Sequence, residues 1–287
     1  MTLSFPYPLV KTLWLAQHIG DKNVRIIDSS WRLPGAADSG AQAYADRHIP
    51  GAVFFDLDEI SDKSTSLPHM LPSRAQFELA VGELGVSQND RVIVYDDAGI
   101  FSAARVWWTF RAMGHRDVSV LDGGLPKWLA EGRPTTSQIT PVKKVKYAAG
   151  EPLAQAAPAA DVNAALDRDD VVVIDARPRD RFFGRAPEPR PGLRSGHMPG
   201  AGNLPHSALL AKDGTMLGVD DMKPLFAGLG VSPDRLVITS CGSGVTAAVL
   251  TLALEALGHQ RHALYDGSWA EWGIAGNDPD KFPVAAG

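Results

Sequence analysis

The feature that most constrains the fold is an internal repeat: short motifs of the first half return, in the same order, about 145 residues later. His48-Ile49-Pro50-Gly51-Ala52 is matched by His197-Met198-Pro199-Gly200-Ala201, and Asp122-Gly123 is matched by Asp266-Gly267. A period this long indicates duplicated domains rather than a solenoid of small repeats. The chain has 287 residues, which is long enough for two hydrophobic cores.

Each half alternates short apolar runs, typical of buried parallel strands, with stretches at helical spacing. The predicted strands lie near residues 24–28, 52–55, 91–95, 118–121, 171–175, 201–204, 235–239 and 262–265. This alternation predicts an α/β fold in which each half forms a mainly parallel sheet with helices on both faces.

Between the halves, a stretch rich in Pro, Thr, Ala and Lys has no strong period and predicts a linker. We expect an N-terminal domain at residues 1–135, a linker at 136–158 and a C-terminal domain at 159–287. The halves also differ in length: the second has about two extra residues between Asp175 and His197, in an arginine-rich stretch.

The only cysteine of the chain opens a loop between the strand predicted at 235–239 and an Ala- and Leu-rich helix. The loop, Cys241-Gly242-Ser243-Gly244-Val245-Thr246, contains two glycines and can turn consecutive N–H groups into one concavity at a helix N-terminus. Such a position favours the thiolate, the reactive form of cysteine, so Cys241 is a candidate nucleophile. Alternatively, Cys241 is a small buried hydrophobic residue, as free cysteines usually are. The repeat aligns Cys241 with Asp97, so only the second half has kept this chemistry.

The composition argues against several function classes. The net charge of −5 comes from mixed charges, with no basic stripe that would bind nucleic acid. One cysteine cannot form an internal disulfide, and the longest apolar run, 247–257, is too short to span a bilayer. The N-terminal segment lacks the pattern of a signal peptide. We therefore expect a soluble cytoplasmic protein without nucleic-acid or membrane partners.

With these features in view, the chain resembles the two-domain rhodanese superfamily from about Val10 to Trp272. The motifs that carry the resemblance are 48–52, 69–72 (HMLP), 105–108 (RVWW), 121–124 (LDGG), 187–190 (PEPR), 195–197 (SGH), 241–247 (CGSGVTA) and 265–269 (YDGSW). Within the superfamily, the set is similar to the bacterial 3-mercaptopyruvate sulfurtransferases. The resemblance implies two tandem rhodanese-like domains, of which the N-terminal one is non-catalytic, and an enzyme that uses no metal and no organic cofactor.

The resemblance also implies the residues of a site. Arg181 and Arg190 would bind the carboxylate and keto oxygen of an α-keto acid, with Arg185 as a substitute and solvated loop arginines as the alternative. Ser243, His69 and Asp58 would form a proton relay, with Asp56 as a competitor for Asp58. The backbone amides of residues 242–246, those of Gly242, Ser243, Gly244, Val245 and Thr246, would stabilise the anionic sulfur.

These roles imply that Cys241 takes the sulfur of 3-mercaptopyruvate as a persulfide, releases pyruvate, and passes the sulfur to cyanide or to a thiol such as thioredoxin. The nearest alternative is a thiosulfate-preferring rhodanese, whose loop typically carries Arg and Lys where this chain has Gly242 and Ser243. A cysteine phosphatase is disfavoured because the sixth residue after the cysteine is Ala247 instead of a phosphate-binding Arg. A non-catalytic sulfur carrier would need Cys241 but neither the paired arginines nor His69.

Overall fold

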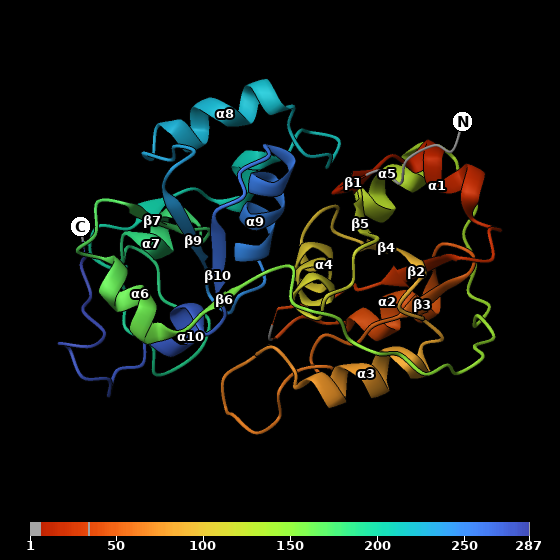
Figure 1. Ribbon diagram of the computed structural model, residues 1–287, viewed down its shortest axis with the longest axis horizontal. Coiled ribbons are helices and arrows are strands. Elements are labelled where there is room, and N and C mark those ends of the chain that lie inside the picture. The colour runs from red at the N-terminus through yellow and green to blue at the C-terminus, as the bar shows by residue number, and fades with distance from the viewer. Residues whose placement is uncertain (1–6, 34, 287) are drawn as a thin grey trace. The chain divides into compact units, whose positions relative to one another are not determined.

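The computed structural model describes residues 7–33 and 35–286 of the chain, and Figure 1 labels most of its helices and strands. The chain forms two compact units, and each unit includes a short segment from the other half of the sequence. Unit 1 comprises the chain up to Asp62, Leu71–Ala154 and Leu210–Met216. Unit 2 comprises Lys63–Met70, Gln155–Leu209 and the chain from Leu217 onward.

Unit 1 is built on five parallel strands in the order β1-β5-β4-β2-β3. Its elements are β1 Leu9–Val10, α1 Thr12–His18, β2 Val24–Asp28, α2 Gly40–Asp46, β3 Ala52–Phe54, α3 Arg74–Glu83, β4 Arg91–Tyr95, α4 Ser102–Ala112, β5 Val118–Leu121 and α5 Gly124–Ala130. On one face of the sheet, Ile26 and Ile93 pack with Leu15 of α1 and Trp128 of α5. On the other face, α4 packs on β4 and β5 and meets α3 through Phe110 and Phe77, whose rings lie edge to face.

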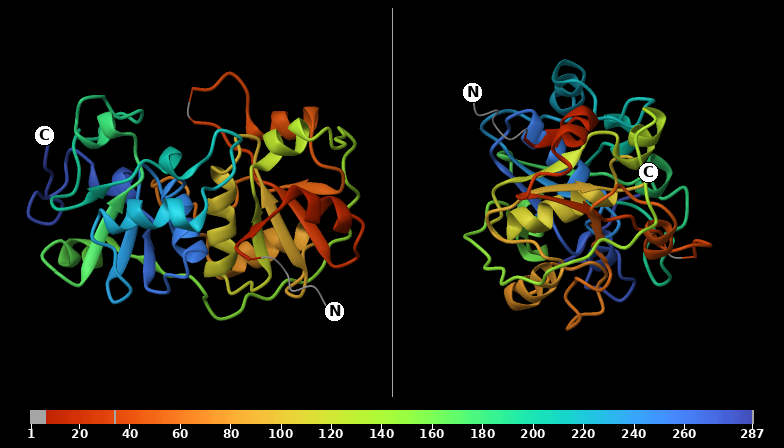
Figure 2. Two further views of the ribbon diagram at one scale, coloured as in Figure 1. Left: turned by 90° about the horizontal axis from the view of Figure 1, so that it is seen from above. Right: turned by 90° about the vertical axis from the view of Figure 1, so that its right-hand side faces the viewer.

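Unit 2 repeats this plan with the strand order β6-β10-β9-β7-β8, again all parallel. Its elements are β6 Ala156–Ala157, α6 Ala159–Ala165, β7 Val171–Asp175, α7 Arg179–Phe182, β8 Gly202–Asn203, the 3-10 helix η1 His206–Leu209, α8 Val219–Ala227, β9 Leu236–Ser240, α9 Ala247–Ala256, β10 His262–Tyr265 and α10 Ser268–Trp272. Val162 of α6 and Trp269 of α10 pack against Ile238 on one face, while α9 contacts β9 and β10. Figure 2 gives two further views.

The predicted fold class is confirmed, and the four predicted strands of each half occur within one or two residues of their expected positions. The edge strands β1 and β6, which contain two residues each, were not predicted. So short a run has no periodicity to detect. Instead, pairing with β5 and β10 holds these strands in place.

Residues 136–154 of the predicted linker belong to unit 1. The N–H of Val145 donates to the carbonyl of Gly82 in α3 at 2.9 Å, and buried Tyr147 packs edge-on against Phe77. The predicted domain boundaries themselves stay a prediction. Within residues 7–33 and 35–286, no helix combines the length and hydrophobicity that a membrane crossing requires.

Candidate active site

Cys241 lies at the carboxyl end of β9, in the six-residue segment 241–246 that leads into α9 and is called the cysteine loop below. Both flanking elements are fixed by burial, because four of the five β9 residues and the first eight residues of α9 are buried. Cys241 itself is 2 % exposed. The thiol therefore sits on a rigid strand-to-helix connection, where the helix N-terminus favours a negative charge.

Ser268 of α10 holds the cysteine loop in its conformation. Its Oγ accepts the N–H groups of Cys241 at 3.2 Å and of Gly244 at 3.1 Å, and donates to the carbonyl of Tyr265 at 2.8 Å. The N–H of Trp269 donates to the carbonyl of Cys241 at 2.9 Å. Ser268 belongs to the motif at residues 265–269, but no role was predicted for it.

Four amides of the cysteine loop, those of Gly242, Ser243, Val245 and Thr246, have no hydrogen-bond acceptor within the described part of the chain. Buried or half-buried N–H groups are normally paired, so four such donors in one short loop form a site for an anion. All four of these residues were predicted to bind through their amides. Gly244 differs, because its N–H is already used by Ser268.

The sheet register identifies the counterpart of this loop in unit 1. Asp28 of β2 pairs with Tyr95, and Asp175 of β7 pairs with Ser240. The residue that follows Tyr95 is Asp96, so Asp96 and not Asp97 is the counterpart of Cys241. The alignment by sequence is wrong by one residue because β4 begins directly after Asp90, whereas β9 begins one residue later after Asp234.

In unit 1 the corresponding loop, which begins at Asp96, binds a carboxylate that belongs to the loop itself. The Asp96 carboxylate accepts the N–H groups of Ala98 at 2.9 Å, Phe101 at 2.8 Å and Ala103 at 2.8 Å. Burial outweighs the lowering effect of these three donors and raises the pKa of Asp96 to about 6, which is below neutral pH, so the carboxylate form predominates there. The unit 1 loop is therefore an example, within the same chain, of this backbone shape holding a negative charge.

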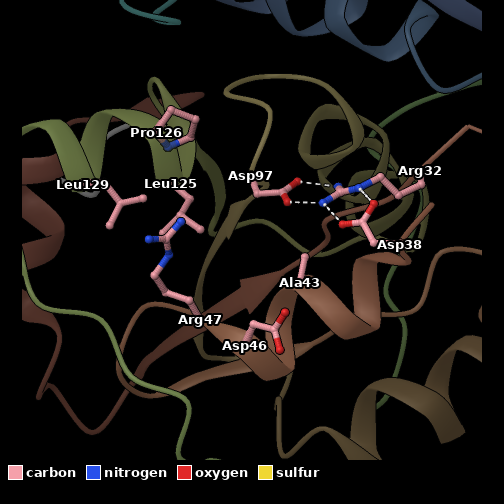
Figure 3. Close-up of a pocket in the computed structure, with 9 residues that line it drawn as sticks. All are labelled: Arg32, Asp38, Ala43, Asp46, Arg47, Asp97, Leu125, Pro126 and Leu129. Carbon is pink, nitrogen blue, oxygen red and sulfur yellow. Dashed lines mark hydrogen bonds and ion pairs between the residues drawn. The ribbon is translucent and has the colours of Figure 1, made fainter. Parts of the chain in front are cut away.

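A cavity of about 600 Å³ adjoins the unit 1 loop (Figure 3). Its Arg32 is bonded to both oxygens of Asp97, at 2.8 and 2.6 Å, and to both oxygens of Asp38, at 3.0 Å each. Asp97 follows Asp96 as Gly242 follows Cys241. The corresponding site of unit 1 thus has no thiol, and its charged side chains, Arg32 and Asp97, are bound to each other.

The structure brings two predicted relay residues together in unit 2. His69 belongs to the 63–70 segment, and its Nδ1 lies 3.1 Å from Oγ of Ser243. Both side chains are buried, and His69 has a left-handed backbone with φ of 61°. Asp58 belongs to unit 1, where its Oδ2 accepts a hydrogen bond from Nε1 of Trp31 at 3.0 Å. The Asp58 step of the relay stays a prediction.

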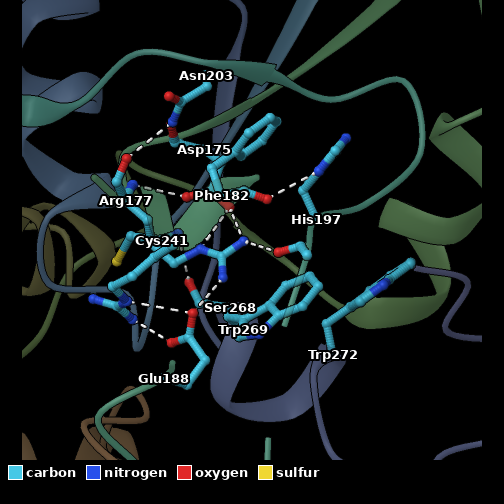
Figure 4. Close-up of polar contacts among 12 residues, drawn as sticks. Asp175, Arg177, Phe182, Glu188, His197, Asn203, Cys241, Ser268, Trp269 and Trp272 are labelled. Atoms are coloured by element: carbon cyan, nitrogen blue, oxygen red, sulfur yellow. Dashed lines mark hydrogen bonds and ion pairs between the residues drawn. The ribbon is translucent and has the colours of Figure 1, made fainter. Parts of the chain in front are cut away.

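Arg181 of α7 lies against the cysteine loop: a Cβ added at Gly242 would stand 3.0 Å from its Nη2. Its guanidinium is bound by the carboxylate of Glu188, which also accepts Nη1 of Arg177 at 2.8 Å (Figure 4). No role was predicted for Glu188 or Arg177. Arg190 is half-buried in the segment between α7 and β8, and its predicted substrate contact is not tested.

A model of the rhodanese-like domain matches the chain twice, at residues 11–131 and 158–275. The chain belongs to the rhodanese family. It is 43% identical over 267 residues to the 3-mercaptopyruvate sulfurtransferase of Escherichia coli (strain K12), covering 93% of this chain and 95% of that one. The crystal structure of the E. coli 3-mercaptopyruvate sulfotransferase SseA superposes with a TM-score of 0.83 at 41% identity, covering 91% of this chain and 98% of that chain.

Rhodanese relatives of similar identity differ in the donor that their names state. The Arabidopsis thaliana thiosulfate/3-mercaptopyruvate sulfurtransferase 2 is 41% identical over 293 residues, covering 95% of this chain and 86% of that protein. The comparisons therefore establish an enzyme of the rhodanese family, grouped with proteins named 3-mercaptopyruvate sulfurtransferase. Because the name of one relative includes both thiosulfate and 3-mercaptopyruvate, the choice between these two donors must be argued from the residues of the site.

Proposed function

We propose that this enzyme transfers the sulfur atom of 3-mercaptopyruvate to a thiol or to cyanide through a persulfide on Cys241, and releases pyruvate. The observation that carries the proposal is the cysteine loop, in which a buried thiol lies among four amide N–H groups without acceptors. The carboxylate that the unit 1 loop binds supports the same role for these amides toward an anionic persulfide.

In the first half-reaction, the Cys241 thiolate attacks the sulfur of 3-mercaptopyruvate and an S–S bond forms. The bond between that sulfur and C3 of the substrate breaks, and its electron pair becomes the enolate of pyruvate. A proton then moves from the sulfur to C3, which leaves pyruvate and an anionic persulfide. Ser243 lies within hydrogen-bond distance of His69, and this pair supports a proton relay to the leaving enolate, with Asp58 as its third member.

The second half-reaction returns the enzyme to its starting state. A thiolate, such as that of a reduced thioredoxin, attacks the outer sulfur, and Cys241 leaves as the thiolate. Cyanide would accept the sulfur in the same way and become thiocyanate. The protein partner and the cytoplasmic location stay predictions.

Arg181 and Arg190 are the proposed ligands of the substrate carboxylate and keto oxygen. The position of Arg181 beside Gly242 supports its part in this role. Thiosulfate is the second candidate donor, favoured by the name of the Arabidopsis relative. The neutral side chains of Gly242 and Ser243 favour the monoanionic keto acid instead.

The test is a mass spectrum of the intact protein after treatment with 3-mercaptopyruvate. Wild-type protein should gain about 32 Da, the mass of one sulfur atom, and the Cys241→Ser variant should gain none. Ser240→Ala is the matched control, since this neighbouring buried hydroxyl has no hydrogen-bond partner among the described residues. Persulfide transfer that survives Cys241→Ser would refute the mechanism. A higher kcat/KM with thiosulfate than with 3-mercaptopyruvate would assign the donor to the second candidate.

A further inference from the structure

Glu188 is a buried carboxylate held between two guanidinium groups. Its side chain is 1 % exposed, and it accepts Nη1 of Arg177 at 2.8 Å and Nε of Arg181 at 3.3 Å, with a further bond from Nη2 of Arg181. Arg177 is equally buried and is also paired with Asp175 at 2.8 Å. Two cations and two anions therefore form one network of ion pairs, which runs from Asp175 through Arg177 and Glu188 to Arg181 (Figure 4).

Arg181 is the member of this network that lies beside Gly242 of the cysteine loop. Arg181 is 21 % exposed and lies beside Gly242, whereas the side chains of Asp175, Arg177 and Glu188 are each 1 % exposed. The positive charge that Arg181 presents to a substrate is thus offset by a carboxylate on the same guanidinium. Residues 242–246 add no charged side chain to this part of the site.

We infer that Glu188 is a specificity-determining residue, which offsets the charge of Arg181 so that the site selects a monoanionic α-keto acid over a dianionic donor. This inference rests on the proposed function. A fixed buried carboxylate repels every bound anion, and a dianion experiences that repulsion twice, with little solvent to screen it. Glu188 also holds the guanidinium in place, so a monocarboxylate meets a donor already oriented.

The alternative is that Glu188 serves stability alone, because removing one member of a buried ion pair is costly whatever the site does. A charge-specific measurement separates the two roles. Oxamate and oxalate have nearly the same size and shape, but at neutral pH oxamate carries one negative charge and oxalate carries two. Their relative binding therefore reports the charge preference of the site with the ligand shape held constant.

The experiment measures the dissociation constants of oxamate and oxalate by calorimetry for the wild type, Glu188→Gln and Glu188→Asp. Wild-type protein should bind oxamate at least 10-fold more tightly than oxalate. Glu188→Gln, which keeps the size and removes the charge, should reverse that order, while Glu188→Asp should retain it. With thiosulfate and 3-mercaptopyruvate as donors, Glu188→Gln should change the ratio of the two KM values at least 10-fold.

Glu255→Gln is the control, since it removes a carboxylate of the same unit at the far end of α9, where Glu255 pairs with His262. An unchanged oxamate-to-oxalate ratio in folded Glu188→Gln would overturn the inference. Should that variant fail to fold, the wild type decides, because equal or tighter binding of oxalate is incompatible with the inference. Binding needs no turnover, so absent activity with 3-mercaptopyruvate would contradict the proposed function and leave this result standing.

Discussion

Ser268 offers the sharpest test of how the cysteine loop is held. One hydroxyl accepts the N–H groups of Cys241 and Gly244 and donates to the carbonyl of Tyr265, and the side chain is fully buried. Ser268→Ala removes the acceptor while leaving both amides in place. Since no other part of the side chain reaches them, these donors lose their hydrogen bonds together.

The cost of Ser268→Ala can be estimated from these bonds. A buried donor left unsatisfied costs about 1–3 kcal/mol, so two such amides cost roughly 2–6 kcal/mol in unfolding free energy. A displacement of the thiol by about 1 Å would lower kcat on the order of 100-fold, because reactivity depends on the attack geometry. The loss in unfolding free energy is large against a typical stability of about 5–15 kcal/mol.

Two variants separate the hydrogen bonds from other effects of Ser268→Ala. Ser268 has a φ of 49°, and Gly124, at the corresponding place after β5 in unit 1, has a φ of 54°. Ser268→Gly should therefore be about 1 kcal/mol less destabilising than Ser268→Ala, since glycine adopts this conformation without steric cost. Ser240→Ala deletes a buried hydroxyl with no hydrogen-bond partner among the described residues, and should be close to neutral. Denaturant unfolding and turnover rates measure all three. Equal losses for Ser268→Ala and Ser240→Ala would refute the reasoning.

Three further outcomes are expected. Gly242→Ala brings a Cβ to 3.0 Å from Nη2 of Arg181, so KM for the keto acid should rise several-fold. The unfolding free energy should change by less than about 0.5 kcal/mol. A fall in kcat that exceeds the rise in KM would contradict this prediction. Gly82→Ala places a Cβ 2.5 Å from the carbonyl of Val145, so limited proteolysis near Val145 should accelerate despite the better helix propensity of alanine. Burial lowers the pKa of His115 below its ordinary 6.5 in the folded protein. On acidification the unfolded chain therefore binds the proton at a higher pH than the folded protein does, and stability falls as the pH drops below 6.5. His115→Gln should show a smaller fall in acid titrations of thermal unfolding, and an unchanged pH profile would count against this cause.

The strands and the nucleophile loop were predictable because their signals are local. Residues 24–28, 91–95 and 171–175 are apolar runs of strand length and form β2, β4 and β7 as expected. Cys241 is unique in the sequence and is followed by two glycines, so its place at a strand end required no tertiary information. The Ser243–His69 contact was predictable only through the resemblance, since 174 positions separate the two residues.

The alignment of β4 with β9 and the lengths of the connections around α2 and α7 were not predictable from a count of residues. Tyr44 of α2 and Phe182 of α7 correspond, because each stacks on a histidine, His48 or His197, at 4.0 Å between ring centroids. In unit 1 the long connection precedes this helix, whereas in unit 2 it follows the helix. The connection before the helix is therefore longer in unit 1 and the connection after it is longer in unit 2, and these two length differences nearly cancel to a net difference of about two residues. The longer connection after α7 is the one that contains Glu188.

The comparison of the two loops explains why one cysteine is sufficient for a duplicated chain. In unit 1, the Asp96 carboxylate already occupies three amides of the loop, and Asp97 adds a second negative charge bound to Arg32. In unit 2, Cys241 and Gly242 stand at these two positions, and four of the loop amides, those of Gly242, Ser243, Val245 and Thr246, have no acceptor among the described residues. An anionic donor is therefore excluded from unit 1 twice, once by the missing thiol and once by charge. The same backbone therefore satisfies these donors internally in unit 1 and leaves four of them without an acceptor among the described residues of unit 2, so the two loops differ in adjacent side chains rather than in fold.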